Sequence, residues 1–188
     1  MQKNKTLIIS LICLAVLILV YLLWHNVWQG SANKMPTQKL NFSNLDSAQT
    51  IEIIRNQQIT TLTKENNNWQ VVTEENSAAN SQFIDNLISG LKEINSGLII
   101  SSQSQTLPNF NLTEELATKL KITDQQNNIL AEMLIGKSAT PEYSKTYIKL
   151  PNSDNVLLVP GNLFKAVNQN DWKQPPPTAT NTNSNTNQ

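Results

Sequence analysis

The most pronounced pattern in the chain is an uninterrupted apolar run near its N-terminus. Residues 7–24 contain no charged side chain, and aromatic residues gather at the end of the run. A helix rises about 1.5 Å per residue, so extension to Trp28 gives about 33 Å, enough to cross the hydrocarbon core of a bilayer. Lys3 and Lys5 precede the run, and basic flanks stay in the cytoplasm. The pattern predicts a cytoplasmic tail (residues 1–6) and a single-pass signal anchor in the cell membrane (residues 7–28), with the remainder extracytoplasmic.

A cleaved signal peptide is the alternative interpretation of this run. The apolar region of such a peptide usually has about 7–15 residues, which is shorter than the run found here. Gly30-Ser31-Ala32 resembles a cleavage site only loosely. The uncleaved anchor is therefore favoured, with Cys13 facing lipid and His25 at the interface, so that neither residue serves catalysis.

Beyond a polar spacer at residues 29–44, the pattern becomes that of β-strands. Runs rich in β-branched and aromatic residues cover 51–55, 58–64 and 69–72. Asn56-Gln57 and Asn66-Asn67-Asn68 separate these runs, and asparagine tolerates the left-handed backbone that tight turns require. This segment predicts three antiparallel strands joined by short turns.

A helical period then replaces the strand pattern. Asn80 is suited to cap a helix N-terminus. After it, an apolar stripe recurs at helical spacing, formed by Phe83, Ile84, Leu87, Ile88, Leu91 and Ile94. Such a stripe is typical of a helix that packs one face against a sheet.

The remaining pattern predicts further strands over residues 98–100, 116–123, 129–136, 146–150 and 156–159, and a short helix over 162–168. The element order favours an α+β domain at residues 45–173, in which one main amphipathic helix packs on an antiparallel β-sheet. Residues 174–188 carry prolines and small polar residues without large apolar side chains, so we expect a disordered tail.

Six short motifs give the chain a family resemblance. They are Trp69-x-Val71, Ala79-Asn80, Phe110-Asn111-Leu112, Leu134-Ile135-Gly136, Tyr147-Ile148 and Asp171-Trp172. Their order and spacing, over residues 45–173, resemble the uncharacterised bacterial domain-of-unknown-function family 4340. Asn111 stands where that family usually has glycine, which a left-handed backbone would tolerate. The proline that commonly follows this third motif is absent after Leu112.

The resemblance implies an extracytoplasmic, often membrane-anchored protein. Some relatives of this kind accompany ABC-type transporters linked to gliding motility. The family has no established catalytic residues, so the resemblance assigns none to this chain.

Composition excludes several function classes. The chain has 14 basic and 14 acidic side chains, whereas a nucleic-acid binder needs a basic excess. One cysteine and one histidine exclude a disulfide, thiolate-built metal sites and multi-histidine sites. We therefore expect no nucleic acid, metal or cofactor. The 26 asparagines and 15 glutamines are interpreted as polar surface filler.

Three motifs invite a catalytic or ligand-binding interpretation. Gly136-Lys137-Ser138 ends like a phosphate-binding loop, but Ala131 stands where that loop needs glycine. The acidic pairs Glu74-Glu75 and Glu114-Glu115 are sequence neighbours, whose side chains point apart on strands. Asp154 could contribute to a hard-cation site, yet no calcium-loop pattern surrounds it. Solvated surface is the favoured interpretation of these acids.

Aromatic residues offer the remaining candidate surface. Most of them are expected in the core, because each buries a large apolar area. A partner surface or groove is hypothesised at Phe110, Asn111, Tyr147 and Trp172. The leading hypothesis is a non-enzymatic accessory module that is held by the bilayer through residues 7–28 and binds an envelope protein. The alternatives are a tethered small-ligand or glycan-binding domain and a hydrolase that uses carboxylates alone.

Overall fold

The computed structural model describes residues 3–29, 35–42, 44–73 and 76–175, and the chain divides into two units between Pro36 and Thr37. The first unit contains helix α1 (Lys3–Gln29). Its described apolar side chains, at Ile9 and from Leu11 to Leu23, are all exposed. Among the described residues, no helix combines the length and the hydropathy needed to cross a membrane. The transmembrane helix expected at residues 7–28 thus remains a prediction.

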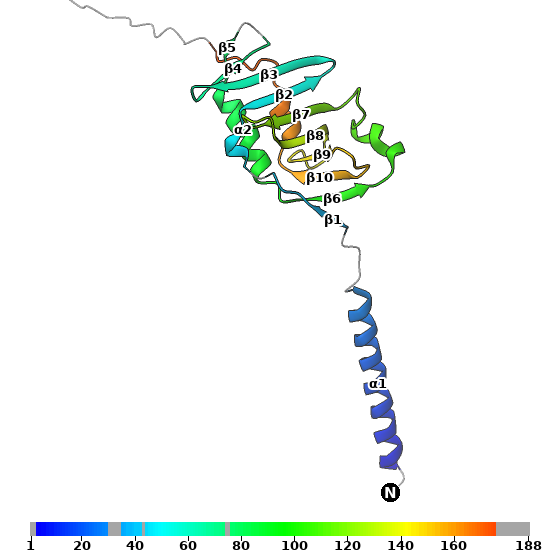
Figure 1. Ribbon diagram of the computed structural model, residues 1–188. Helices are drawn as coiled ribbons and strands as arrows, with labels where there is room; N and C mark the ends of the chain where they lie inside the picture. Colours follow the sequence, from blue (N-terminus) through cyan, green and yellow to red (C-terminus); the bar gives the residue numbers. More distant parts are fainter. Residues whose placement is uncertain (1–2, 30–34, 43, 74–75, 176–188) are drawn as a thin grey trace, which may run out of the picture. The chain divides into compact units, whose positions relative to one another are not determined.

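The second unit is built on a ten-stranded sheet in which every neighbouring pair is antiparallel (Figure 1). The spatial order is β1-β6-β10-β9-β8-β7-β2-β3-β4-β5. The strands are β1 (Thr37–Lys39), β2 (Thr50–Arg55), β3 (Gln58–Glu65), β4 (Asn68–Val71), β5 (Ser77–Ala78), β6 (Ser96–Ser101), β7 (Thr118–Thr123), β8 (Ile129–Ser138), β9 (Lys145–Lys149) and β10 (Val156–Pro160). Two meanders, β2 to β5 and β7 to β10, therefore meet where β2 pairs with β7.

Two helices cover one face of this sheet. Helix α2 (Ser81–Lys92) buries Ile84, Leu87 and Leu91, and the short α3 (Leu163–Val167) contacts α2, β8 and β9. The side chain of Asn80 accepts a hydrogen bond from the backbone of Gln82, so the predicted N-cap is confirmed. The α+β prediction, an antiparallel sheet with one main amphipathic helix packed on it, is confirmed as well.

Asparagine has a backbone role that the composition alone does not reveal. Nine described residues other than glycine have positive φ, and eight of them are asparagines; Gln57 is the ninth. The hairpin turn Asn56-Gln57 and the turn Asn66-Asn67 have both central residues left-handed, as a two-residue hairpin requires. The interpretation of asparagine as mere surface filler is therefore wrong at these positions. In a chain with five glycines, asparagine supplies left-handed turns.

The domain boundaries extend further at both ends than the sequence indicates. Thr37–Lys39, within the predicted spacer, form edge strand β1 against β6, and Leu40 is buried. At the other end, the backbone N–H of Gln174 donates to the carbonyl of Ala78 at 2.8 Å, so Gln174 belongs to the ordered domain. The rest of the expected disordered tail, from residue 176, lies outside the described residues. Two 3-10 helices, at Leu45–Ser47 and Ser104–Phe110, were not predicted.

Candidate functional site

The face of the sheet opposite α2 and α3 carries a half-buried apolar surface. Leu98 in β6 pairs directly with Leu158 in β10, which pairs with Tyr147 in β9, so these three side chains share one face. The ring of Phe110 lies 4.7 Å from that of Tyr147, tilted by 54°. We call these four residues, Leu98, Phe110, Tyr147 and Leu158, the aromatic patch. All four are half-buried, and they lie on the face opposite α2 and α3.

Phe110 is held in the patch by its backbone. The 3-10 helix Ser104–Phe110 ends at Asn111, whose φ of 57° is left-handed, as the asparagine-for-glycine replacement predicts. The chain then turns back so that Leu112 is buried above Gly136 in β8. A side chain at position 136 would collide with the carbonyl oxygen of Phe110. Gly136 therefore allows the segment to lie directly on the sheet.

Three of the six sequence motifs thus meet at the patch. Phe110-Asn111-Leu112, Ile135-Gly136 and Tyr147-Ile148 contact one another, although 37 residues separate the two aromatic rings. Two of the four candidate surface residues, Phe110 and Tyr147, belong to the aromatic patch, and Asn111 adjoins it. Leu98 and Leu158 were not among the candidates.

Trp172 lies elsewhere and is 5% exposed. Its carbonyl accepts the backbone N–H of Asn80 at 2.7 Å, and its ring stands edge-on to Phe83, with centroids 6.2 Å apart. Ala79 bridges to Lys173 and also donates to the carbonyl of Trp69. The other three motifs therefore fasten the C-terminal segment to α2 and β4. The expectation of Trp172 as a partner surface is wrong, because the ring is packed inside the domain.

The other half of the open face is charged. Glu52 in β2 pairs with Lys121 in β7, which pairs with Glu132 in β8, so charges of alternating sign cross three adjacent strands. Opposite charges on directly opposed residues are mildly stabilising. This half presents a solvated surface beside the aromatic patch.

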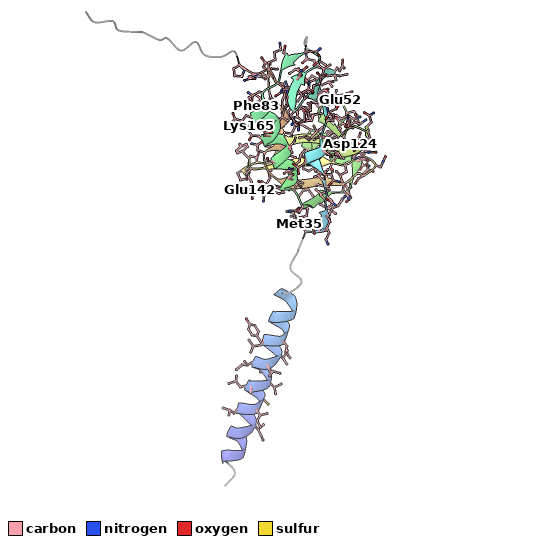
Figure 2. The ribbon with its side chains drawn as sticks, turned by 60° about the vertical axis from the view of Figure 1, so that its left-hand side comes forward. Met35, Glu52, Phe83, Asp124, Glu142 and Lys165 are labelled. Atoms are coloured by element: carbon pink, nitrogen blue, oxygen red, sulfur yellow. The ribbon has the colours of Figure 1, made fainter. Side chains whose placement is uncertain are left out.

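A groove of about 400 Å³ lies on the helical side, between α2 and the segment around α3. Its walls include Phe83, Asn86 and Gly90 from α2, and Asn162, Lys165 and Gln169 from the other segment. Figure 2 places Phe83 and Lys165 on one side of the domain and Glu52 on the other. No local sequence pattern predicts this groove. Its one sequence signal is Gly90, a glycine inside a helical stripe.

The motifs with catalytic potential do not converge. Gly136-Lys137-Ser138 lies within strand β8, so its amides belong to the sheet and not to a phosphate-binding loop. Glu114, Glu115 and Asp154 are exposed, and Glu74 and Glu75 lie outside the described residues. Within the described ranges, no group of three histidine, cysteine or acidic residues could hold a metal ion.

Asp124 has a perturbed pKa for a purely local reason. The side-chain amide of Asn128 donates to its carboxylate at 2.9 Å, and the backbone N–H groups of Asn128 and Gln126 add to this. These bonds favour the ionised form and hold the pKa of Asp124 below its ordinary value of 3.8. The carboxylate closes the turn between β7 and β8.

Comparison with known proteins gives one match. A family model described as "Domain of unknown function (DUF4340)" matches residues 69–181, more than half of the chain. No curated protein and no solved structure matches.

Proposed function

The chain belongs to the DUF4340 family of domains of unknown function, and from this premise we propose that it is a non-enzymatic, membrane-anchored module that binds an envelope protein outside the cytoplasm. The family description names no activity, so the support for this proposal comes from this chain's own residues. One observation supports it most strongly: the aromatic patch is a half-buried apolar surface on the sheet face that α2 and α3 leave uncovered.

The proposed anchor is helix α1. It has 27 residues, or about 40 Å of helix, and the sequence has no Asp, Glu, Lys or Arg between Lys5 and Lys34. The proposed membrane segment covers residues 7–28, and a bilayer core requires about 20 residues of helix. Lys3 and Lys5 support a cytoplasmic N-terminus.

The patch suits a protein partner for two reasons. Its core is aromatic and aliphatic, as the buried centre of a protein interface is, and the charged half of the same face supplies a polar rim. The segment that carries Phe110 is seated on the sheet through Gly136, so the surface is preformed and little ordering cost opposes binding.

The absence of catalysis is part of the proposal. The sequence after Trp28 contains neither histidine nor cysteine, so the commonest general base and the strongest side-chain nucleophile are both missing. The described acids are spread over helices, strands and turns, and within the described ranges no three of them could hold a metal ion. We expect no turnover by the purified chain on hydrolase or transferase panels. Turnover abolished by substitution of Glu114 or Asp154, with the fold intact, would show an enzyme.

Photo-crosslinking in native membranes tests the partner surface. A photoreactive amino acid replaces Tyr147 in the full-length chain, and a matched chain carries it at Lys121 in the charged half. We expect one defined crosslinked protein from position 147 and none from position 121. ABC-type transporter components are the first candidates, because some members of the resembled family accompany such transporters.

A second variant decides whether the crosslink reports binding. Phe110→Ser should remove the product formed at position 147, because half of the aromatic pair is lost. Lys119→Ser, on the charged half, should leave it unchanged. Equal crosslinking from both halves of the face, or a product that survives Phe110→Ser in a folded protein, would contradict the proposed surface.

Protease protection tests the anchor separately. Protease added outside intact spheroplasts should digest the domain. Protection of the domain until lysis would reverse the proposed orientation, and release of the intact chain by a salt wash would argue against a spanning helix.

A further inference from the structure

The wall of the groove between α2 and α3 includes a glycine, Gly90, that the helix itself does not require. Gly90 lies near the end of α2 with an ordinary helical backbone, and a Cβ there would meet one atom, Cδ2 of Leu163, at 3.8 Å. That is an ordinary contact, so alanine would fit. Glycine inside a helix costs roughly 1 kcal/mol relative to alanine. Neither backbone strain nor crowding accounts for a glycine at position 90. Glycine there does keep the groove open.

Two side-chain amides along the groove are each held by hydrogen bonds at one end. The Oδ1 atom of Asn162 accepts from the backbone of Lys165 at 3.0 Å and from Ser138 at 3.3 Å, and its amide nitrogen donates to no other described residue. The side-chain nitrogen of Gln169 donates to two carbonyls of α3, and its amide oxygen accepts from no group in the described ranges. The side chain of Asn86, exposed on α2, forms no hydrogen bond within the described part of the chain. The groove can thus both donate to and accept from a ligand rich in hydroxyl groups.

Charge selects among such ligands. The described residues that line the groove include no carboxylate, and Lys165 forms no ion pair within the described chain. An ammonium group beside neutral amides favours an anionic ligand. Opposite these groups, Phe83 supplies an apolar aromatic wall, which suits the C–H face of a sugar ring.

We propose that this groove binds a carboxylated sugar, with the ring against Phe83, its hydroxyl groups on the side-chain amides and its carboxylate on Lys165. The volume of about 400 Å³ falls in the range of small-ligand sites. This site lies on the face opposite the aromatic patch and does not depend on the proposed partner interaction.

Titration calorimetry on the detergent-solubilised full chain tests the site with sodium glucuronate as the probe. Glucose supplies the ring without the charge, and sodium acetate supplies the charge without the ring. We expect saturable binding of glucuronate in the millimolar range or tighter, and weaker or no binding of the other two. Lys165→Met should weaken glucuronate binding about tenfold, to the level of glucose, because a charge-assisted hydrogen bond is lost.

A blocking variant distinguishes the groove from nonspecific charge effects. Gly90→Leu should abolish binding by filling the groove, whereas Ser89→Leu, the neighbouring exposed position on α2, should not. Circular dichroism confirms that each variant is folded. Absence of saturable glucuronate binding by the unmodified chain, equal binding of glucose or acetate, or binding that survives Gly90→Leu in the folded chain would each overturn the proposal.

Discussion

The carbonyl oxygen of Phe110 occupies the space that the Cβ of any residue other than glycine would need at position 136, although 26 positions separate the two residues in the chain. This close approach seats the 3-10 helix on strand β8 and brings the ring of Phe110 against Tyr147. One glycine therefore determines whether the aromatic patch exists.

We expect Gly136→Ala to lower the free energy of unfolding by about 1–3 kcal/mol, because a side chain forced into a packed contact must displace the backbone above it. Urea denaturation of residues 35–188 measures the change. Gly90→Ala is the matched control: it has room for its Cβ and should leave stability unchanged or raise it by up to about 1 kcal/mol. Equal effects of the two substitutions would contradict the clash.

The sequence predicts those parts of the fold that depend on neighbouring residues. The stripe from Phe83 to Leu91 marks a helix because its apolar positions recur at helical spacing, whereas Ile94 lies past the end of α2 at Lys92. The left-handed backbone of Asn111 follows from the family pattern and residue chemistry alone. By contrast, β1 and β5 have three and two residues, too few for any period to emerge.

The sites depend on distant partners, so the sequence shows them only in part. Trp172 is adjacent to a polar tail in sequence, which suggests exposure, but Asn80 and Phe83 bury it from more than 85 positions away. In sequence, Gly136 resembles part of a nucleotide-binding motif. Its contact with Phe110 shows that the glycine instead lets a distant segment pack on the sheet. The groove combines residues of α2 with residues around α3, and no local pattern links the two segments.

Gln57 should be replaceable by glycine with a gain in stability. It has φ of 65°, and a left-handed backbone costs a residue with a Cβ roughly 1–2 kcal/mol. We expect Gln57→Gly to raise the free energy of unfolding by about 0.5–1 kcal/mol, since part of that gain is offset by the greater entropy of glycine in the unfolded chain. Gln58→Gly, the exposed neighbour in β3, should instead lower stability by roughly 0.5–1 kcal/mol. If both changes destabilise equally in urea, the turn geometry is wrong.

The turn closed by Asp124 should make a small pH-dependent contribution to stability. Its pKa is lowered chiefly by the side-chain amide of Asn128, so the folded state favours the carboxylate. The stabilisation is present above the ordinary value of 3.8 and is lost as the pH falls through the lower folded-state pKa. In a carboxyl-carbon NMR titration, Asn128→Ala should move the pKa of Asp124 back toward 3.8. Gln125→Ala, which changes an exposed side chain in the same turn, should leave the pKa unchanged.

The C-terminal end of the folded domain should lie just beyond Gln174, and paired truncations can locate it. Removal of residues 171–188 takes away the ring that packs on Phe83 and the carbonyl that accepts from Asn80. Loss of a buried tryptophan typically costs about 3–5 kcal/mol, a large share of the stability of a domain this size. Removal of residues 176–188 keeps these contacts, together with the bond from Gln174 to Ala78. We therefore expect the longer truncation to lower the midpoint of thermal unfolding markedly and the shorter one to leave it unchanged.

A shorter truncation that destabilises as much as the longer one would place essential contacts beyond Pro175. A longer truncation without effect would mean that Trp172 does not hold the domain together.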